Sequence, residues 1–505
     1  MAADNISNSH KLTIGLPIHN EEQSLPQFIN ALKIAALSLP DDVDIEVVAC
    51  VNGCDDKSEE ILRKYAASPD GEKLNMKVIE SGKGKMAAQL AIAKQSTLKG
   101  PICFMDADTL PSPDSLKLLW RQMQHDPTCY TTFARVQPYY DKDPSKMSDF
   151  EKGLQAYYKS RDYLPPKPYI HGRMFMMRDR EALLDMENIN WKERADKVED
   201  REIAKSLSLE EGIWADDVYL SRAIAHKHGL KSIREVPLAK VYFHPPEHEA
   251  DYFAGTRRLL MELKRLELLF PEYNHLEEAF ARVKRTDSMS ILSRHMSPEE
   301  INSLRYYKEL EDKYTKAIEK MIAENNYESM AHDDLWTRVD TSKKTFDKLV
   351  EQPEFIPFDE TTARNYATSV LTVPFTKDGK LVTIKNDRGW DLPGGHLERN
   401  EDYTAGAKRE SREEANITYS SLKPCGLIKF NDPANPNGCM VVMAGKVNSV
   451  GTHKPGDEIF ERRISTPEEF LKDYTATSRS TMSSIIAAAR QALSTERERA
   501  DIKLV

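Results

Sequence analysis

No run of about 18 consecutive apolar residues, the length that a membrane-spanning helix requires, occurs in this 505-residue sequence. The first residues, MAADNISNSHKLTIGL, also lack the basic and then apolar plan of a secretory signal. Both absences predict a cytoplasmic protein without a transmembrane segment.

Positive charge is scarce relative to negative charge. The sequence has 71 Lys and Arg residues against 81 Asp and Glu residues, which gives a formal net charge of −10. Nucleic acids and anionic membranes attract basic surfaces, so neither is expected to be the main partner of this chain.

Cysteines are few, and their positions exclude a structural zinc site. The six cysteines are scattered and lack the paired spacing of zinc ligands, so free thiols are expected in a cytoplasmic protein. The rest of the composition, 40% hydrophobic and 30% charged, is that of a folded protein. Its length predicts about three domains.

Two carboxylates follow a short apolar run in the first quarter of the chain. Ile102–Met105 has the pattern of a buried strand, and Asp106 and Asp108 come directly after it. In open α/β sheets, ligands bind at the carboxyl ends of the strands. Two hard oxygen ligands there suit Mg²⁺ or Mn²⁺ holding a diphosphate. A solvated turn remains the alternative, because Asp also favours turns.

The residues before this pair alternate between strand and helix patterns. Strands are expected at Leu12–Ile18, Ile45–Val51 and Met76–Ser81, and helices between them. This alternation is typical of an α/β protein with a parallel, doubly wound sheet. Each strand ends in polar or glycine residues, so we expect the following loops to converge on one edge of the sheet.

The order of these motifs resembles the family-2 glycosyltransferases of GT-A (Rossmann-like) fold, over roughly residues 11–260. The matching segments are PIHNEE (17–22), GKMAAQLA (84–91) and DAD (106–108), although Gln89 and Ala91 replace the family's Asn and Gly. The resemblance implies a nucleotide-sugar donor, with Asp55 or Asp56 meeting the base or ribose and the DAD pair holding the metal. The residues expected to contact the donor are Pro17, Asn20, Glu22, Asp55, Asp56, Lys85 and Asp106. Lys83 and Lys85 are candidates for phosphate contacts, although such glycine-rich loops are common on surfaces.

Three later segments extend the resemblance. Residues 171–178 (HGRMFMMR) resemble the family's acceptor-side strand, and residues 213–221 (IWADDVYLS) its E-D-x-x-L-S segment. The latter implies that Asp217 takes the proton of an acceptor hydroxyl in a single displacement that inverts the sugar carbon. Asp216 as the base, or both acids as a helix cap, remain alternatives. His244, at the end of a strand, is either a third metal ligand or a structural histidine.

The residue pattern changes from alternating strands and helices to helices alone beyond this region. Long charged stretches with helical spacing follow Asp251 and predict a helical connector. We therefore expect a glycosyltransferase-like domain at 1–250, the connector at 251–354 and a further domain at 355–505.

Three glutamates share one helical face in the last domain. Glu410, Glu413 and Glu414 are spaced i, i+3 and i+4. Like charges so crowded repel one another unless a cation or a basic partner relieves them. A solvated acidic helix face is the alternative.

With Gly395, Glu401 and Arg409, these glutamates resemble the Nudix box, G-x5-E-x7-R-E-U-x-E-E-x-G-U, from Gly395 to Ile417. The resemblance implies an α/β/α sandwich in which the three glutamates hold Mg²⁺ or Mn²⁺ that activates water against a diphosphate, braced by Glu401 and Arg409. Ser411 replaces an apolar residue and is expected to loosen the helix. Asn416 replaces glycine, a mild change because Asn tolerates a left-handed helix cap. Asp457 and Glu458 are candidates for an additional base.

Together these patterns predict a bifunctional enzyme: a metal-dependent, inverting glycosyltransferase fused to a Nudix hydrolase. Its partners would be a nucleotide-sugar donor, an acceptor and a nucleoside-diphosphate-linked compound. Two alternatives remain at this point: a Nudix domain that only senses a nucleotide, and a nucleotidyltransferase in place of the glycosyltransferase. A nucleotidyltransferase would be expected to have a G-x-G-T-R-like loop after the first strand, and this sequence has no such loop there.

Overall fold

The chain forms two compact units. The computed structural model describes residues 10–82, 84–140, 142–178, 180–246, 248–277, 280, 288–324, 354–386, 389–430, 437–453, 459–474 and 479–494. The N-terminal unit comprises Met1–Leu292 and Pro298–Phe346, and the C-terminal unit comprises Ser293–Ser297 and Asp347–Val505. Within the described residues no helix is long and apolar enough to cross a membrane.

The first four strands of the N-terminal unit are parallel, as their alternation with helices predicts. They are β1 (Lys11–Ile18), β2 (Asp44–Asn52), β3 (Met76–Ser81) and β4 (Ile102–Met105). β1 lies between β2 and β4, and β3 lies outside β2. The loops that follow β1, β2 and β4 therefore leave the sheet at the same edge.

The other half of this eight-stranded sheet is mixed. It contains β5 (Thr109–Pro111), β6 (Thr131–Pro138), β7 (Met174–Met177) and β8 (Ile233–Phe243), and the full order is β3-β2-β1-β4-β7-β6-β8-β5. β7 runs antiparallel to β4. The residues that enter β7 therefore lie beside the residues that leave β4, and the Asp106 N–H donates to the Arg173 carbonyl at 2.9 Å.

Helices cover both faces of this sheet. Leu12, Ile14 and Leu16 of β1 belong to one buried cluster with α2 and α6, and Phe104 of β4 belongs to another with α5 and α11. Gly15 faces α5, and a Cβ there would lie 2.9 Å from Ile92. The described helices of this unit are α2 (Leu25–Leu37), α3 (Ser58–Ala66), α4 (Pro69–Lys73), α5 (Lys85–Gln95), α6 (Ser115–His125), α7 (Asp149–Ser160), α8 (Glu181–Leu184), α9 (Trp191–Asp196), α10 (Arg201–Ser206), α11 (Asp216–His228), α12 (Glu249–Leu269) and α15 (Pro298–Ala323). A further helix, α14 (Ser288–His295), has residues in both units.

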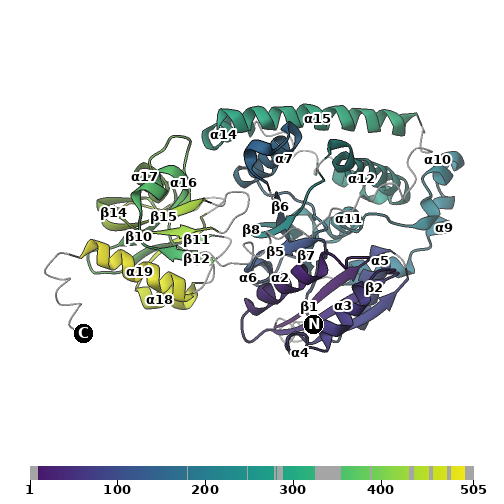
Figure 1. Ribbon diagram of the computed structural model, residues 1–505, viewed down its shortest axis with the longest axis horizontal. Coiled ribbons are helices and arrows are strands. Elements are labelled where there is room, and N and C mark those ends of the chain that lie inside the picture. The colour runs from purple at the N-terminus through teal and green to yellow at the C-terminus, as the bar shows by residue number, and fades with distance from the viewer. Residues whose placement is uncertain are drawn as a thin grey trace. The chain divides into compact units, whose positions relative to one another are not determined.

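The predicted connector is helical where it is described. The long helix α15 runs along α7 and also contacts α12 (Figure 1). Stacked rings join these helices, with Tyr157 and Tyr307 centroids 4.8 Å apart and Phe253 and Tyr314 centroids 4.5 Å apart. Residues 325–353 of the predicted connector lie outside the described residues, and the three domain boundaries remain predictions.

The C-terminal unit is a sheet between helices. Leu371 and Val373 of β10 pack in one cluster with α19, and Val370, which points the other way, packs with α17. The path of the sheet is β12-β11-β10-β15-β14-β9, with β13 beside β10 and β16 beside β11. The elements are β9 (Glu354–Ile356), α16 (Glu360–Tyr366), β10 (Ala367–Phe375), β11 (Leu381–Asn386), β12 (Gly389–Asp391), β13 (Gly394–His396), α17 (Tyr403–Ala415), β14 (Ile417–Lys429), β15 (Cys439–Val450), β16 (Glu461–Ser465), α18 (Pro467–Asp473) and α19 (Arg479–Leu493).

One buried carboxylate ties several segments of the N-terminal unit together. Glu46 of β2 is 1% exposed and accepts hydrogen bonds from Thr13 at 2.9 Å, from Thr97 at 2.7 and 3.1 Å, and from Leu98 N at 2.9 Å. Burial alone would raise the pKa of Glu46, but these hydrogen bonds lower it from 4.5 to about 2. The charged form is therefore stabilised in the folded chain.

We predict that Glu46→Gln lowers the free energy of unfolding at pH 7 by about 3 kcal/mol, because a change of one in pKa corresponds to about 1.4 kcal/mol. Because the folded pKa is depressed, this stabilisation is present above pH 4.5 and is lost as the pH falls toward about 2. Urea denaturation at several pH values measures both effects. The exposed Glu80, which pairs with Arg63, is the control: Glu80→Gln should change stability by no more than about 0.5 kcal/mol. Equal losses for the two variants would contradict the prediction.

Candidate functional site

Three elements bring charged side chains together at the carboxyl end of β4. Lys85, the first residue of α5, places its Nζ 2.8 Å from Asp106 Oδ1 and 3.4 Å from Asp216 Oδ2. Asp216 is the first residue of α11 and is buried. The lysine therefore bridges the acid that follows β4 and the acid that opens α11.

The cluster carries more negative than positive charge. Burial raises the pKa of Asp106 to about 6; Lys85 opposes the rise, and the nearby charges of Asp108 and Asp216 add to it. Burial would lower the pKa of Lys85, yet Asp106 and Asp216 raise it, so the lysine remains protonated. Crowded carboxylates that one lysine only partly neutralises fit a divalent cation, whose preferred ligands are carboxylate oxygens.

Asp217 lies next to this cluster and is held by a glycine. The Gly172 N–H donates to Asp217 Oδ2 at 2.9 Å, and the Gly172 carbonyl accepts from Lys85 Nζ at 3.2 Å. A Cβ at Gly172 would lie 3.0 Å from Asp217 Oδ2, so glycine permits this approach. Burial raises the pKa of Asp217, and the neighbouring Asp216 adds to the rise.

The two adjacent acids have different surroundings. Asp216 Oδ2 contacts Lys85 and accepts a hydrogen bond from Gln89 Nε2 at 2.6 Å. Asp217 Oδ1 accepts from the next backbone N–H, that of Val218, at 2.9 Å. Both acids lie in the first turn of α11, whose N-cap residue is Ala215. Asp216 is thus engaged by two side chains, the half-buried Lys85 and the buried Gln89, whereas Asp217 is engaged by backbone groups.

Asp108 and His244 lie at the ends of paired strands. Thr109 of β5 is opposite Phe243 of β8 in an antiparallel register. Asp108, which precedes Thr109, and His244, which follows Phe243, therefore lie at the same end of this strand pair. Arg173 Nη1 lies 3.4 Å from Asp108 Oδ2, and its guanidinium covers the Phe243 ring at 4.2 Å. Among the described residues of the whole chain, no group of three His, Cys, Asp or Glu side chains is placed to hold a metal ion. The role of His244 remains a prediction.

The loops after β1 and β2 interlock. Asn20, in a left-handed conformation (φ 54°), accepts from the Asp55 N–H at 2.8 Å, and the Glu22 N–H donates to Asp56 Oδ2 at 3.0 Å. Asp56 also accepts from Ser58 N through its other oxygen, whereas Asp55 is exposed. Of the predicted donor-binding residues, Pro17 lies inside β1. Lys83, Asp457 and Glu458 lie outside the described residues.

The sequence does not reveal the support beneath Asp216 and Asp217. Glu262 Oε1 accepts from the N–H groups of Trp214 and Ala215 at 3.0 and 3.3 Å. Arg265 pairs with Glu262 at 3.0 Å, and its guanidinium stacks on the Trp214 ring at 3.7 Å. Glu262 and Arg265 are fully buried. In the sequence, these two residues look like an ordinary i, i+3 pair on an exposed helix, so no pattern identifies them as part of a site. Gln89, Gly172 and Arg173 belong to segments that match the family motifs, but the sequence assigns them no role.

In the C-terminal unit, one arginine joins three of the predicted glutamates. Arg409 donates to both oxygens of Glu401 at 2.9 and 2.8 Å, a strong bidentate arrangement. Its Nη1 also donates to Glu410 at 2.7 Å and to Glu413 at 3.1 Å. The hydrogen bond from Arg409 lowers the pKa of Glu401, whereas burial raises the pKa of Glu410. Glu414 accepts from Gly394 N at 2.8 Å.

Gly395 and Asn416 occupy positions that few residues fit. A Cβ at Gly395 would lie 2.5 Å from the Glu410 carboxylate, so only glycine allows this approach. Asn416 ends α17 in the left-handed conformation (φ 48°), and its N–H donates to the Arg412 carbonyl at 3.1 Å. The tolerance expected of asparagine at this cap is confirmed.

Ser411 does not leave an apolar gap. It is fully buried, and its hydroxyl lies 2.7 Å from Tyr419 OH and 3.1 Å from Thr372 Oγ1. The Thr372 hydroxyl also donates to the Pro393 carbonyl at 2.9 Å. Instead of loosening α17, Ser411 joins it to β10 and β14 through hydrogen bonds.

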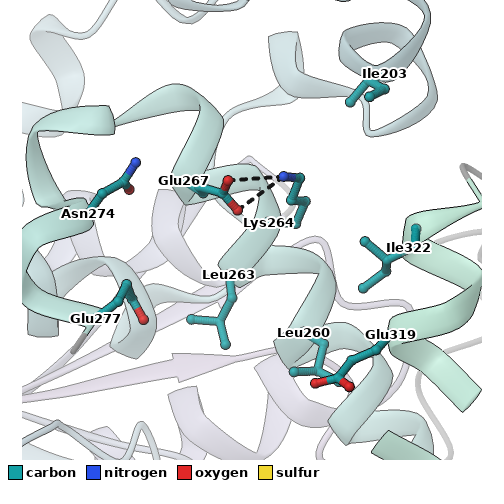
Figure 2. Close-up of a pocket in the computed structure, with 10 residues that line it drawn as sticks. Ile203, Leu260, Leu263, Lys264, Glu267, Asn274, Glu277, Glu319 and Ile322 are labelled. Atoms are coloured by element: carbon teal, nitrogen blue, oxygen red, sulfur yellow. Dashed lines mark hydrogen bonds and ion pairs between the residues drawn. The ribbon is translucent and has the colours of Figure 1, made fainter. Parts of the chain in front are cut away.

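A pocket of about 780 Å³ lies elsewhere in the N-terminal unit, between α10, α12, α15 and the 3₁₀ turn η6 (Pro271–Leu276). Figure 2 shows Lys264 and Glu267 paired at its wall, 3.0 Å apart, and Glu277 pairs with Arg222. Its lining contains none of the residues predicted for a site: Ile203, Leu260, Leu263, Lys264, Glu267, Asn274, Glu277, Glu319, Ile322 and Ala323. The clusters around Lys85 and Arg409 are therefore the candidate sites.

A segment of each unit matches the model of a known family. Residues 13–184 match the model of glycosyl transferase family 2, and residues 365–484 match the model of the NUDIX domain. No curated protein matches the chain. Both resemblances found in the sequence are confirmed, and the match to the first model counts against a nucleotidyltransferase.

Solved structures give weaker similarities. The MutT protein from Methanosarcina mazei Go1 is 22% identical, with 24% of this chain and 93% of that chain covered and a TM-score of 0.20. The mannosyltransferase PcManGT from Pyrobaculum calidifontis, in complex with GDP-Man and Mn²⁺, is 17% identical, with 63% and 88% covered and a TM-score of 0.35. S. aureus TarS 1-349, in complex with UDP, is 13% identical, with 62% and 91% covered and a TM-score of 0.32. The family models, rather than these structures, support the assignment.

We predict that Ser411→Ala lowers the stability of the C-terminal unit by about 1–3 kcal/mol, because it removes a buried hydroxyl that hydrogen-bonds to both Tyr419 and Thr372. Adding Tyr419→Phe should recover most of the loss, which a double-mutant cycle measured by denaturation reports. Ser420→Ala is the control, since Ser420 is exposed and should contribute about 0.5 kcal/mol or less. Additive losses in the double variant would show that the two hydroxyls do not depend on each other.

Proposed function

Because the chain contains a glycosyltransferase family 2 domain and a Nudix domain, we propose that it is a bifunctional enzyme. The first domain transfers a sugar from a nucleoside-diphosphate donor to an acceptor with inversion, in a metal-dependent reaction. The second domain hydrolyses a nucleoside-diphosphate-linked compound. The first activity is supported by the contacts at one edge of the sheet, where Lys85 pairs with Asp106 and the backbone of Gly172 binds both Lys85 and Asp217.

The donor would lie across the ends of β1, β2 and β4. Asn20 and Glu22, in the loop after β1, form hydrogen bonds with the loop after β2. In that second loop, Asp55 is the better candidate for contact with the base or ribose, because both oxygens of Asp56 already accept backbone hydrogen bonds. Asp106 and Asp108 would hold Mg²⁺ or Mn²⁺. When bound, that ion neutralises charge that develops on the leaving diphosphate.

Asp217 is the proposed base. Gly172 N fixes one of its oxygens, and its pKa is raised by burial, which improves its ability to accept a proton from the acceptor hydroxyl. Asp216 is the weaker candidate, because Lys85 and Gln89 both contact it. A single displacement on the side of the sugar opposite the diphosphate inverts the reacting carbon.

In the Nudix domain, Glu410, Glu413 and Glu414 are the proposed ligands of Mg²⁺ or Mn²⁺, which supplies an activated water for attack on a diphosphate. Arg409 holds Glu401 through two hydrogen bonds and the His396 carbonyl through a third. It can therefore release Glu410 and Glu413 while still bracing the loop. One observation favours a nucleotide sensor instead: Arg409 already neutralises part of the charge of Glu410 and Glu413.

We predict that Asp217→Asn reduces sugar transfer by about 10²–10⁴-fold, the usual contribution of a general base, while donor binding persists. Transfer rates and nucleotide binding, measured on the same preparation with Mn²⁺ and a panel of nucleotide sugars, separate the two effects. Asp42→Asn, at an exposed side chain, should leave both unchanged. If Asp216→Asn abolished transfer and Asp217→Asn did not, the base would be Asp216.

We predict that Glu413→Gln reduces hydrolysis of nucleoside-diphosphate-linked compounds by at least about 100-fold, because it removes a proposed metal ligand. Mass spectrometry of the nucleotide products measures the loss. Glu468→Gln, on the exposed side of α18, is the matched control and should hydrolyse at the wild-type rate. Unchanged hydrolysis by Glu413→Gln would instead support the sensor.

A further inference from the structure

The loop that leads into β7 is fixed through its backbone. It begins after the 3₁₀ turn η2 (Arg161–Tyr163). The Lys167 N–H donates to the buried Glu235 of β8 at 2.8 Å, and the Ile170 N–H donates to the buried Ser221 of α11 at 2.9 Å. Two residues later, Gly172 N is bound to Asp217. The backbone of this loop is therefore held in place where it approaches the proposed base.

Two side chains of this loop have no acidic partner in the part of the chain that the structure describes. Lys167 Nζ lies 3.4 Å from Tyr157 OH and above the rings of Tyr157 and Tyr169, at 5.9 and 5.4 Å from their centroids. Among the described residues, no carboxylate lies within 4.0 Å of this ammonium group. His171 Nδ1 is buried and has no hydrogen-bond partner in the described part of the chain. A buried polar atom left in this state is costly unless a ligand completes it.

The surroundings of His171 are strongly basic. Burial lowers its pKa well below the usual value, and Arg173, Lys167 and Lys85 lower it further. His171 is therefore a neutral imidazole in a positive environment. Such a ring can donate one N–H to an anion without adding to the local charge.

The donor does not require these cations. Lys85 and Arg173 already pair with Asp106 and Asp108. The proposed divalent ion would balance the two negative charges of a donor diphosphate. Lys167 and His171 have no such pairing among the described residues, and they belong to the loop whose Gly172 binds Asp217.

Building on the glycosyltransferase function above, we propose that Lys167 and His171 form an oxyanion subsite, and that the acceptor is an anionic molecule whose phosphate or carboxylate group binds there. The ammonium group of Lys167 supplies the charge, and His171 supplies a neutral hydrogen bond. The group would be held beside Asp217, so that a neighbouring hydroxyl reaches the base. Specificity for a charged acceptor follows from the absence of an acidic partner for Lys167 within the described residues.

Calorimetry on the full chain, saturated with Mn²⁺ and either UDP or GDP, tests the subsite. The probes are glycerol 3-phosphate, glycerate and glycerol. We expect at least one anion to bind much more tightly than glycerol, and its identity distinguishes a phosphate from a carboxylate. Lys167→Met should weaken that binding by about tenfold or more, the usual loss of a charge-assisted hydrogen bond, and His171→Phe should weaken it to a smaller extent.

Two further variants separate recognition from folding. Lys167→Arg keeps the charge and should restore most of the binding, and Lys192→Met, at an exposed lysine, should bind as the wild type does. Equal binding of glycerol and both anions, or equal losses in Lys167→Met and Lys192→Met, would overturn the subsite. Absence of nucleotide binding and of donor turnover in the wild type would overturn the glycosyltransferase function instead, and anion binding is measured independently of turnover.

Discussion

The crowding of carboxylates at the end of β4 is the constraint on which the first site depends. Asp106 and Asp108 come from one segment and Asp216 and Asp217 from another, and these like charges can lie close together only if positive charge accompanies them. Lys85 meets this requirement by contacting Asp106, Asp216 and the Gly172 carbonyl. One side chain thus holds three segments of the site in a single arrangement.

The C-terminal unit solves the same electrostatic problem with a different residue. Arg409 is a planar donor, so it can grip both oxygens of Glu401 and still reach Glu410 and Glu413. In both units, the basic residue is adjacent to acids that the reaction is proposed to use. In each unit, one basic side chain therefore fixes the relative positions of acids from several segments.

Much of this arrangement could be predicted from the sequence, because local patterns carry it. The strand before Asp106, the alternation of the first strands with helices, and the spacing of Glu410, Glu413 and Glu414 are properties of short segments. The antiparallel entry of β7, the buried pair of Glu262 and Arg265, and the hydrogen bonds of Ser411 depend on residues distant in the chain. Ser411 is an example. In the sequence it appears only as the replacement of an apolar residue, because its hydrogen-bond partners lie on β10 and β14, far from it in the chain.

The direction of β7 has a consequence for how this site tolerates change. Asp108 and Arg173 are 65 positions apart, and only the pairing of β4 with β7 brings them together. Their contact therefore depends on the register of that pairing. A slip of β7 by one residue would reverse the sides to which its side chains point and withdraw Gly172 from Asp217. The register of the four residues Met174–Met177 against β4 thus determines whether Arg173 and Gly172 contact Asp108 and Asp217.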